Sequence, residues 1–175
     1  MRNLFPKPSF DFHLQENALD KSDIIILQKL AENADITAAE LVPFVNLSIP
    51  SINKRIDKLK KTGIIKNFTV NIDSKLIGKP IKVFILINID SAERVEQLKE
   101  YVLGNPDILE FYSVTGNYDF VVKACLDNLD SLEMLLSTLK RRFGVVKTQT
   151  MMGLTEHKFI PSPVPQIELV KEEQK

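Results

Sequence analysis

The stretch NLSIPSINKRIDKLKKTGII, residues 46–65, predicts a short helix with a marked start and a marked end. Ser48 is suited to cap its beginning, because a serine hydroxyl can accept a hydrogen bond from a free N–H group, and Pro50 fits the first turn. Gly63 stands where a glycine commonly follows a helix. The apolar residues that would form one buried stripe are spaced by four and three positions: Ile52, Ile56 and Leu59.

The expected helix is strongly basic. Residues 48–62 hold five basic side chains and one acidic one, whereas the whole chain has 23 of each kind. The polar residues nearest its start, Ser48, Ser51 and Asn53, are short enough to approach base edges, and the lysines can reach phosphates. A solvated amphipathic helix with an incidental run of lysines would show the same pattern. The stretch alone leaves both interpretations open.

Two more helices are predicted upstream. Asp20 can cap a helix that runs to about residue 33 and buries Ile26, Leu27 and Leu30. The segment TAAE, residues 37–40, fits a capping box, and the helix it opens should end near residue 45. Pro43 is awkward inside that helix, because proline removes a helical hydrogen bond. Three short helices in about 45 residues indicate a helix-turn-helix.

The pattern changes after a connector that Gly78 and Pro80 interrupt. Residues 81–90 alternate as a strand does, and residues 91–104 have a helical pattern. The further elements predicted are strands at 108–116 and 119–127 around a tight turn, a helix at 129–144 and a strand at 145–153, with 154–160 as a possible additional strand. The order β-α-β-β-α-β is that of the ferredoxin-like split unit.

The first of these strands is apolar on both faces. Phe84 and Leu86 lie on the face opposite to its valine and isoleucines. The two helices of a ferredoxin-like unit cover one face of the sheet only, so the other face predicts a partner sheet, most simply from a second copy of the chain.

The turn TGNYD, residues 115–119, is a candidate ligand site. Gly116 would leave backbone N–H groups free for the carboxylate of a zwitterion, and Asp119 would offer a carboxylate for its ammonium group. A plain hairpin turn that uses Gly-Asn for its unusual dihedral angles gives the same pattern, and the pattern alone favours it.

The sequence contains few patterns that indicate catalysis. His13 and His157 lie far apart, and there is no metal-ligand spacing, no phosphate-binding glycine loop and no nucleophile elbow, so neither an enzyme nor a cofactor is expected. Cys125 is the single cysteine and fits a small buried residue, compatible with a reducing compartment. No secretory leader or membrane-length apolar run occurs, which favours a soluble cytoplasmic protein.

Both halves together are similar to a known family. LDKSDIIILQKLAENADITAAEL followed by NLSIPSINKRIDKLKKTGIIKNFTVNID resembles the DNA-binding half of the Lrp/AsnC, or feast/famine, regulators. VTGNYDFVVKACLDNLDSLEMLL and GVVKTQTMMGL resemble the family's effector-binding half. The resemblance covers residues 19–159 in unbroken order. It implies an α+β fold: an N-terminal winged helix-turn-helix domain and a C-terminal ferredoxin-like βαββαβ (RAM-type) domain.

The resemblance implies partners and site residues as well. The partners are double-stranded DNA, a second copy in a homodimer that often assembles further into tetramers or octamers, and an amino-acid effector bound between dimers. The implied DNA contacts are Ser48, Ser51, Asn53, Lys54, Arg55 and Lys58. The implied effector contacts are Gly116, Asn117, Tyr118 and Asp119, with Thr148 and Thr150 on the final strand.

The resulting division is an arm at 1–18, a DNA-binding domain at 19–68, a linker at 69–80, a dimerisation and effector domain at 81–160 and a proline-rich tail at 161–175. The arm and tail extend beyond the family's usual core, and Asn117 leaves the effector's identity open. Two alternatives remain: a sensor that has lost operator recognition, and an enzyme like the family's decarboxylase group, whose arginine- and histidine-rich stretch does not occur here.

Overall fold

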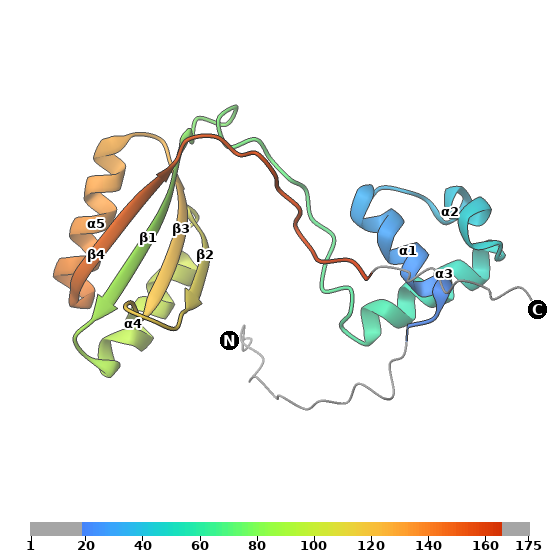
Figure 1. Cartoon of the computed structure of the whole chain (residues 1–175), viewed down its shortest axis with the longest axis horizontal. Coiled ribbons are helices and arrows are strands. Elements are labelled where there is room, and N and C mark those ends of the chain that lie inside the picture. Colours follow the sequence, from blue (N-terminus) through green and yellow to red (C-terminus); the bar gives the residue numbers. More distant parts are fainter. Residues whose placement is uncertain (1–18, 166–175) are drawn as a thin grey trace, which may run out of the picture. The chain divides into compact units, whose positions relative to one another are not determined.

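The computed structural model describes residues 19–165, which divide into two compact units (Figure 1). The first unit contains residues 19–70 and 160–165, and the second contains residues 71–159. The expected arm, 1–18, and the end of the expected tail, 166–175, lie outside the described residues. Within residues 19–165, no helix is both long and apolar enough to cross a membrane.

The first unit is built from three helices, α1 (Lys21–Glu32), α2 (Ala38–Val45) and α3 (Ile49–Lys61). The predicted caps of all three helices are confirmed, because the side chains of Asp20, Thr37 and Ser48 each accept a backbone N–H three residues on. These caps satisfy N–H groups that the first turn leaves free. The buried core of the unit consists of Ile26, Leu30, Leu41, Val45, Ile52 and Leu59.

Two local features set how α2 leads to α3. Pro43 lies inside α2, which nevertheless continues to Val45 as predicted. Asn46 then takes the left-handed conformation, with φ of 51°, and turns the chain toward the Ser48 cap. After α3, Gly63 has φ of 76° and ends the helix where the sequence predicts. In the segment 62–80, turns but no strand connect α3 to the second unit.

The second unit confirms the predicted β-α-β-β-α-β order. Its elements are β1 (Ile81–Ile89), α4 (Ala92–Gly104), β2 (Ile108–Ser113), β3 (Phe120–Leu126), α5 (Leu129–Phe143) and β4 (Val145–Gly153). The four strands form one antiparallel sheet in the order β2-β3-β1-β4. The core lies between the sheet and the two helices, and Cys125 is buried as predicted.

The possible strand at residues 154–160 does not form. At the end of β4, Gly153 pairs with Lys82, so only Ile81 of β1 remains beyond this pair, and Pro80 before it has no N–H to extend the ladder. Side chains hold this segment instead. Glu156 forms an ion pair with Lys82 at 2.6 Å, and the Phe159 ring lies 5.7 Å from the Lys123 ammonium group.

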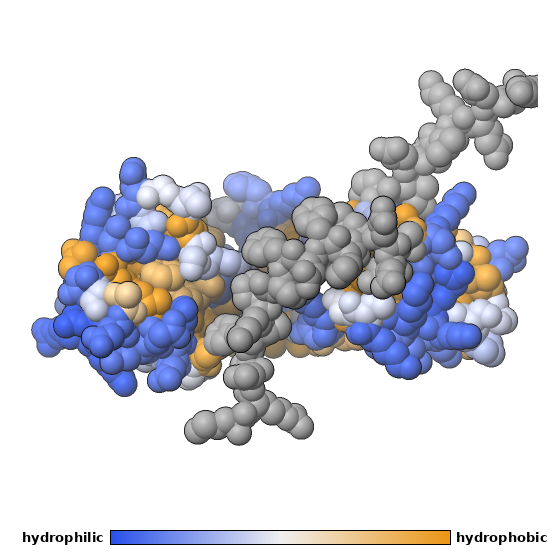
Figure 2. Space-filling view, turned by 90° about the horizontal axis from the view of Figure 1, so that it is seen from below, coloured by the Kyte–Doolittle hydropathy of each residue, from blue (hydrophilic) through white to orange (hydrophobic). Residues whose placement is uncertain are grey.

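The two faces of the sheet differ in their covering. On β1, Val83, Ile85 and Ile87 are fully buried under the helices. Phe84 and Leu86 point to the opposite face, where they remain half-buried. Figure 2 shows hydrophobic surface between hydrophilic patches on this unit. We call the helix-free side the open face; it carries side chains from all four strands.

Candidate nucleic-acid interface and ligand site

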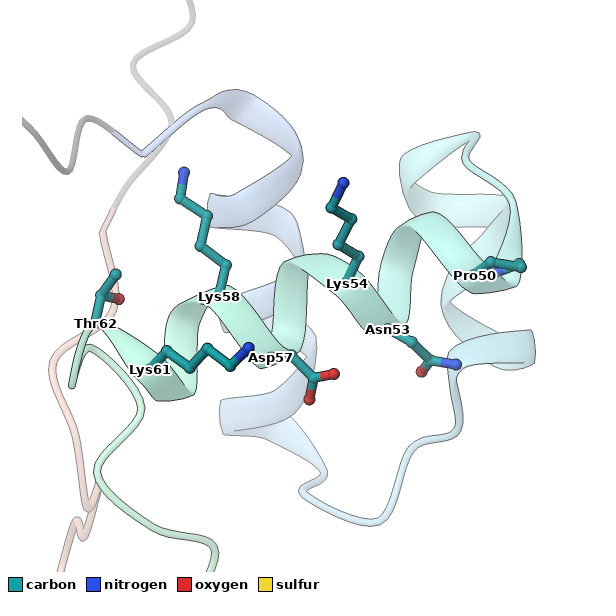
Figure 3. A pocket seen from close by; sticks show the side chains of 7 residues that line it. All are labelled: Pro50, Asn53, Lys54, Asp57, Lys58, Lys61 and Thr62. Atoms are coloured by element: carbon teal, nitrogen blue, oxygen red, sulfur yellow. The ribbon is translucent and has the colours of Figure 1, made fainter.

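The basic helix α3 presents most of the predicted DNA-contact residues to solvent. Ser51, Asn53, Lys54 and Lys58 are exposed, whereas Arg55 is only half-exposed. The hydroxyl oxygens of Ser48 and Ser51 lie 2.9 Å apart at the start of the helix. Lys54 and Lys58 extend from the same side of α3, one turn apart (Figure 3). Within residues 19–165 neither lysine forms an ion pair, so both charges are available to an outside anion.

The exposed side of α3 is also concave. A shallow open hollow runs along it, and its lining includes residues that are not among the expected DNA contacts. These additional residues are Pro50, Asp57, Lys61 and Thr62. The opposite side of the helix carries Ile52 and Leu59 into the core. A helix with one face in the core and a polar, basic face in solvent is the arrangement that a reading helix needs.

Arg55 occupies a different environment from these lysines. Its Nη1 atom lies 2.6 Å from Oδ2 of Asp20 and 2.7 Å from Oδ1 of Asp23, both at the start of α1. The backbone N–H of Asp23 and, secondarily, the Arg55 guanidinium hold the pKa of Asp20 below its ordinary value. The two carboxylates in turn raise the pKa of Arg55. No local sequence pattern indicates this pairing, because the partners are more than 30 positions apart in the chain.

The predicted ligand turn is tied to the sheet by its own groups. Gly116 has φ of 112°, a conformation that favours glycine. The N–H of Asp119 donates to the carbonyl of Ile87 at 3.0 Å, and the Asp119 carboxylate accepts the N–H of Ile89 at 3.0 Å. The side-chain amide of Asn88 donates to the carbonyl of Asn117 at 3.2 Å. These bonds support the plain hairpin interpretation, although they leave the second carboxylate oxygen of Asp119 available.

Tyr118 connects the turn to β4. Its hydroxyl donates to Oε1 of Gln149 at 2.9 Å, and the ammonium group of Lys147 lies 4.7 Å from the centre of its ring. Lys147 pairs with Asn88 across the strands, and the Oδ1 atom of Asn88 is buried without a hydrogen-bond partner among the described residues. The Lys147 ammonium group, the Gln149 amide and the unsatisfied Oδ1 atom of Asn88 therefore lie around the turn.

Thr148 and Thr150 are separated from this group. They pair with Ile87 and Ile85, and residues opposite each other in an antiparallel ladder point to the same side of the sheet. Both threonines therefore face the helix-covered side, whereas Tyr118 contacts Gln149 on the open face. The residues that sequence reasoning missed are Asn88, Lys147 and Gln149. No cluster of three or more possible metal ligands occurs within residues 19–165.

Comparison with known proteins assigns both units. Residues 19–66 match the profile of a winged helix-turn-helix DNA-binding domain, and residues 82–162 match that of the Lrp/AsnC ligand binding domain. The chain belongs to the Lrp/AsnC family of transcriptional regulators. Among its Lrp/AsnC relatives is the HTH-type transcriptional regulator FL11 of Pyrococcus horikoshii, which is 33% identical over 140 residues, or 80% of this chain and 92% of the relative.

Solved Lrp/AsnC structures have the same fold. A transcriptional regulator from Neisseria meningitidis, solved as a complex with L-Met, superimposes with a TM-score of 0.79 at 28% identity. The match covers 83% of this chain and 96% of that one. AsnC from E. coli gives a TM-score of 0.74 at 26% identity and covers 82% of this chain and 97% of its own.

Proposed function

We propose that α3 reads operator DNA in the major groove. The observation that carries this proposal is the pair of exposed ammonium groups of Lys54 and Lys58, free of ion pairs within residues 19–165, beside a helix start rich in short polar side chains. Lysines at such positions bind phosphates, and serine or asparagine near the start of a reading helix can reach base edges. Ser48, Ser51 and Asn53 are the base-reading candidates.

The proposed regulator acts as a dimer. Phe84 and Leu86 on the open face would be covered by the same face of a second copy, because removing a half-exposed apolar surface from water is favourable in free energy. Two reading helices in a symmetric dimer would enter successive major grooves about 34 Å apart and favour a palindromic operator. Further assembly of dimers into tetramers or octamers, and action in the cytoplasm, belong to the same proposal.

An amino acid is the proposed effector. A free amino acid carries a carboxylate and an ammonium group, and the turn offers a complement to each. The N–H groups near Gly116 and the Lys147 side chain suit the carboxylate, while the exposed Asp119 suits the ammonium group. The Neisseria relative solved with L-Met supports this class of effector. Asn117 and Tyr118 would shape the site, whereas Thr148 and Thr150 point to the helix-covered side and would make no direct contact with the effector.

Effector binding would control DNA binding through assembly. If the site lies between dimers, the effector changes which assembly is favoured and hence the spacing of the reading helices. The size of that control equals the difference in the effector's affinity for the two assemblies.

Fluorescence anisotropy with two duplexes tests the DNA-binding proposal. One duplex comes from upstream of the protein's own gene and the other is the same sequence scrambled, and each is titrated at several salt concentrations. The proposal expects selective binding that weakens steeply with salt, because about 6–10 phosphate contacts release counterions. Equal, weak binding to both duplexes would instead favour a sensor that has lost operator recognition.

A further inference from the structure

Arg55 is the basic residue of α3 whose positive charge is already paired with carboxylates of the first unit. Its Nη1 atom contacts one oxygen of Asp20 and one oxygen of Asp23, which belong to the capping box that starts α1. We propose that Arg55 is a positioning residue, which fixes α3 against the start of α1, rather than a DNA contact. This inference rests on the proposed function of α3 as the reading helix.

Each carboxylate divides its two oxygens between the cap and Arg55. Oδ1 of Asp20 accepts the backbone N–H of Asp23 at 2.8 Å, and its Oδ2 accepts Arg55. Oδ2 of Asp23 accepts the backbone N–H of Asp20 at 3.4 Å, and its Oδ1 accepts Arg55. The guanidinium therefore completes the hydrogen bonding of the cap and joins two helices whose contact residues are 32 and 35 positions apart.

Burial makes the pairing necessary. The side chain of Asp23 is only 3% exposed, and a buried carboxylate requires a cation or donors to offset its lost hydration. Arg55 is the cation that meets this need. Removing it would leave Asp23 buried and without an ionic partner, which is strongly unfavourable. The structure thus uses this arginine to satisfy a group in the interior of the unit.

The same pairing weakens Arg55 as a phosphate ligand. One positive charge stands beside two negative ones, so the local cluster is net negative. A phosphate that approached the guanidinium would also approach Asp20, whose side chain is 52% exposed. Lys54 and Lys58 are better placed to bind phosphates, because neither forms an ion pair with a carboxylate within residues 19–165.

A positioning role follows from geometry. The apolar contacts of Ile52 and Leu59 hold α3 on the core, but apolar attraction is non-directional and permits small shifts along or around the helix axis. A guanidinium has donors in a rigid planar arrangement, so its two bonds restrict both movements. Lys54 precedes Arg55 directly and Lys58 follows it by about one turn, so the position of Arg55 determines where both ammonium groups lie.

Replacing Asp20 or Asp23 by asparagine distinguishes a positioning role of Arg55 from a DNA-contact role. Asp23→Asn and Asp20→Asn both weaken the hold on Arg55, and asparagine at position 20 preserves the cap, because it caps helices about as well as aspartate. A positioning role predicts that both variants bind the operator about three- to tenfold more weakly, while the scrambled duplex is bound as well as before or slightly better. A DNA-contact role predicts the opposite sign, because each change removes a negative charge beside the DNA.

The matched control is Asp57→Asn on α3. Asp57 is exposed and forms no ion pair within residues 19–165. Its replacement should strengthen binding to both duplexes slightly, since only repulsion is removed. If Asp20→Asn and Asp23→Asn strengthen binding as Asp57→Asn does, the positioning role is overturned.

The salt dependence gives a second, independent readout. Lys58→Gln should reduce the slope of log K against log salt by about 0.9 for each phosphate that the side chain neutralises in the wild type. Arg55→Ala should lower operator affinity without changing that slope. A slope reduced as much as that of Lys58→Gln would assign Arg55 to the phosphate contacts and contradict the inference.

A double-mutant cycle on Arg55→Ala and Asp23→Asn keeps the test independent of DNA. Unfolding of the full-length variants, followed by amide exchange in α1 and α3, should show that the two changes are strongly non-additive. Additive effects would overturn the pairing. If the wild type fails to select the operator duplex, the proposed function of α3 fails, and this cycle still decides whether Arg55 holds α1 and α3 together.

Discussion

The carboxylate of Asp119 accepts the backbone N–H of Ile89 at 3.0 Å, so the turn between β2 and β3 is bound to the end of β1. The N–H of Asp119 also donates to the carbonyl of Ile87, which strengthens the attachment. One residue therefore has a structural task and a proposed ligand-binding task. Because Asp119→Ala removes both, that variant alone does not distinguish them.

Asp119→Asn separates the two tasks. The amide oxygen of asparagine can still accept the N–H of Ile89, but the negative charge is gone. We expect the thermal unfolding temperature to stay close to that of the wild type, and amino-acid binding to weaken by about tenfold or more, because charge-assisted hydrogen bonds are roughly twice as strong as neutral ones. Differential scanning fluorimetry with the protein amino acids, L-Met included, measures both quantities.

Asp119→Ala provides the comparison, because it should lower the unfolding temperature and abolish the ligand-induced shift together. A ligand-induced shift that survives unchanged in Asp119→Asn would leave Asp119 with its structural task alone and place the ammonium group elsewhere.

Lys147→Gln should weaken amino-acid binding by about two- to fivefold, in the range expected for an exposed charge. The ammonium group lies 4.7 Å from the centre of the Tyr118 ring, which holds it near the turn where the effector's carboxylate is proposed to bind. Isothermal titration calorimetry measures the change in Kd. Lys140→Gln is the matched control, because Lys140 is an exposed residue of α5, a helix that covers the opposite side of the sheet. Equal Kd values for Lys147→Gln and the wild type would remove Lys147 from the site.

Local chemistry made much of the fold predictable. The cap at Asp20 and the capping box at Thr37 each lie within four consecutive residues, so both could be predicted from the sequence. The change from helical spacing to alternation at residue 81 likewise marks the second unit. The pairing of Arg55 with Asp23 was not predictable, because it depends on how α3 crosses the start of α1 and leaves no local pattern.

The side of the sheet to which each β4 side chain points could not be predicted, for a different reason. Val145 is in the core, and plain alternation from it would place Lys147 and Gln149 toward the helices. An irregularity opposite Asn88 and Ile89 inserts one extra residue in β4 and reverses the remaining side chains. Thr148 and Thr150 consequently face the helix-covered side, and the turn gains Lys147 and Gln149 as neighbours instead.

Phe84→Glu should break the proposed dimer. Phe84 lies on the open face between Lys123 of β3 and Met151 of β4, so a glutamate there would be buried in the interface. The neighbouring Lys123 already forms an ion pair with Glu110, so the new charge would be buried without a dedicated partner and should weaken dimerisation by at least about a hundredfold. Light scattering coupled to size-exclusion chromatography measures the mass. The matched control is Leu103→Glu on α4, where the side chain is 51% exposed. Dimers that persist in Phe84→Glu but not in Leu103→Glu would place the interface on the helix side.

The first unit should lose stability in acid through Asp20. Its pKa in the folded state lies below the ordinary value of 3.8, first because of the Asp23 N–H and then because of Arg55. A lowered pKa means that the charged form stabilises the fold, so this contribution is fully present above pH 3.8 and is lost as the pH falls through the lower, folded-state pKa. Glu40 acts in the same direction, because the Thr37 N–H and hydroxyl lower its pKa. Amide exchange in α1, measured from neutral pH down into this range and corrected for the intrinsic rate, should show falling protection. Asp20→Asn should flatten the dependence, and an equally steep loss in that variant would assign the acid sensitivity to other groups.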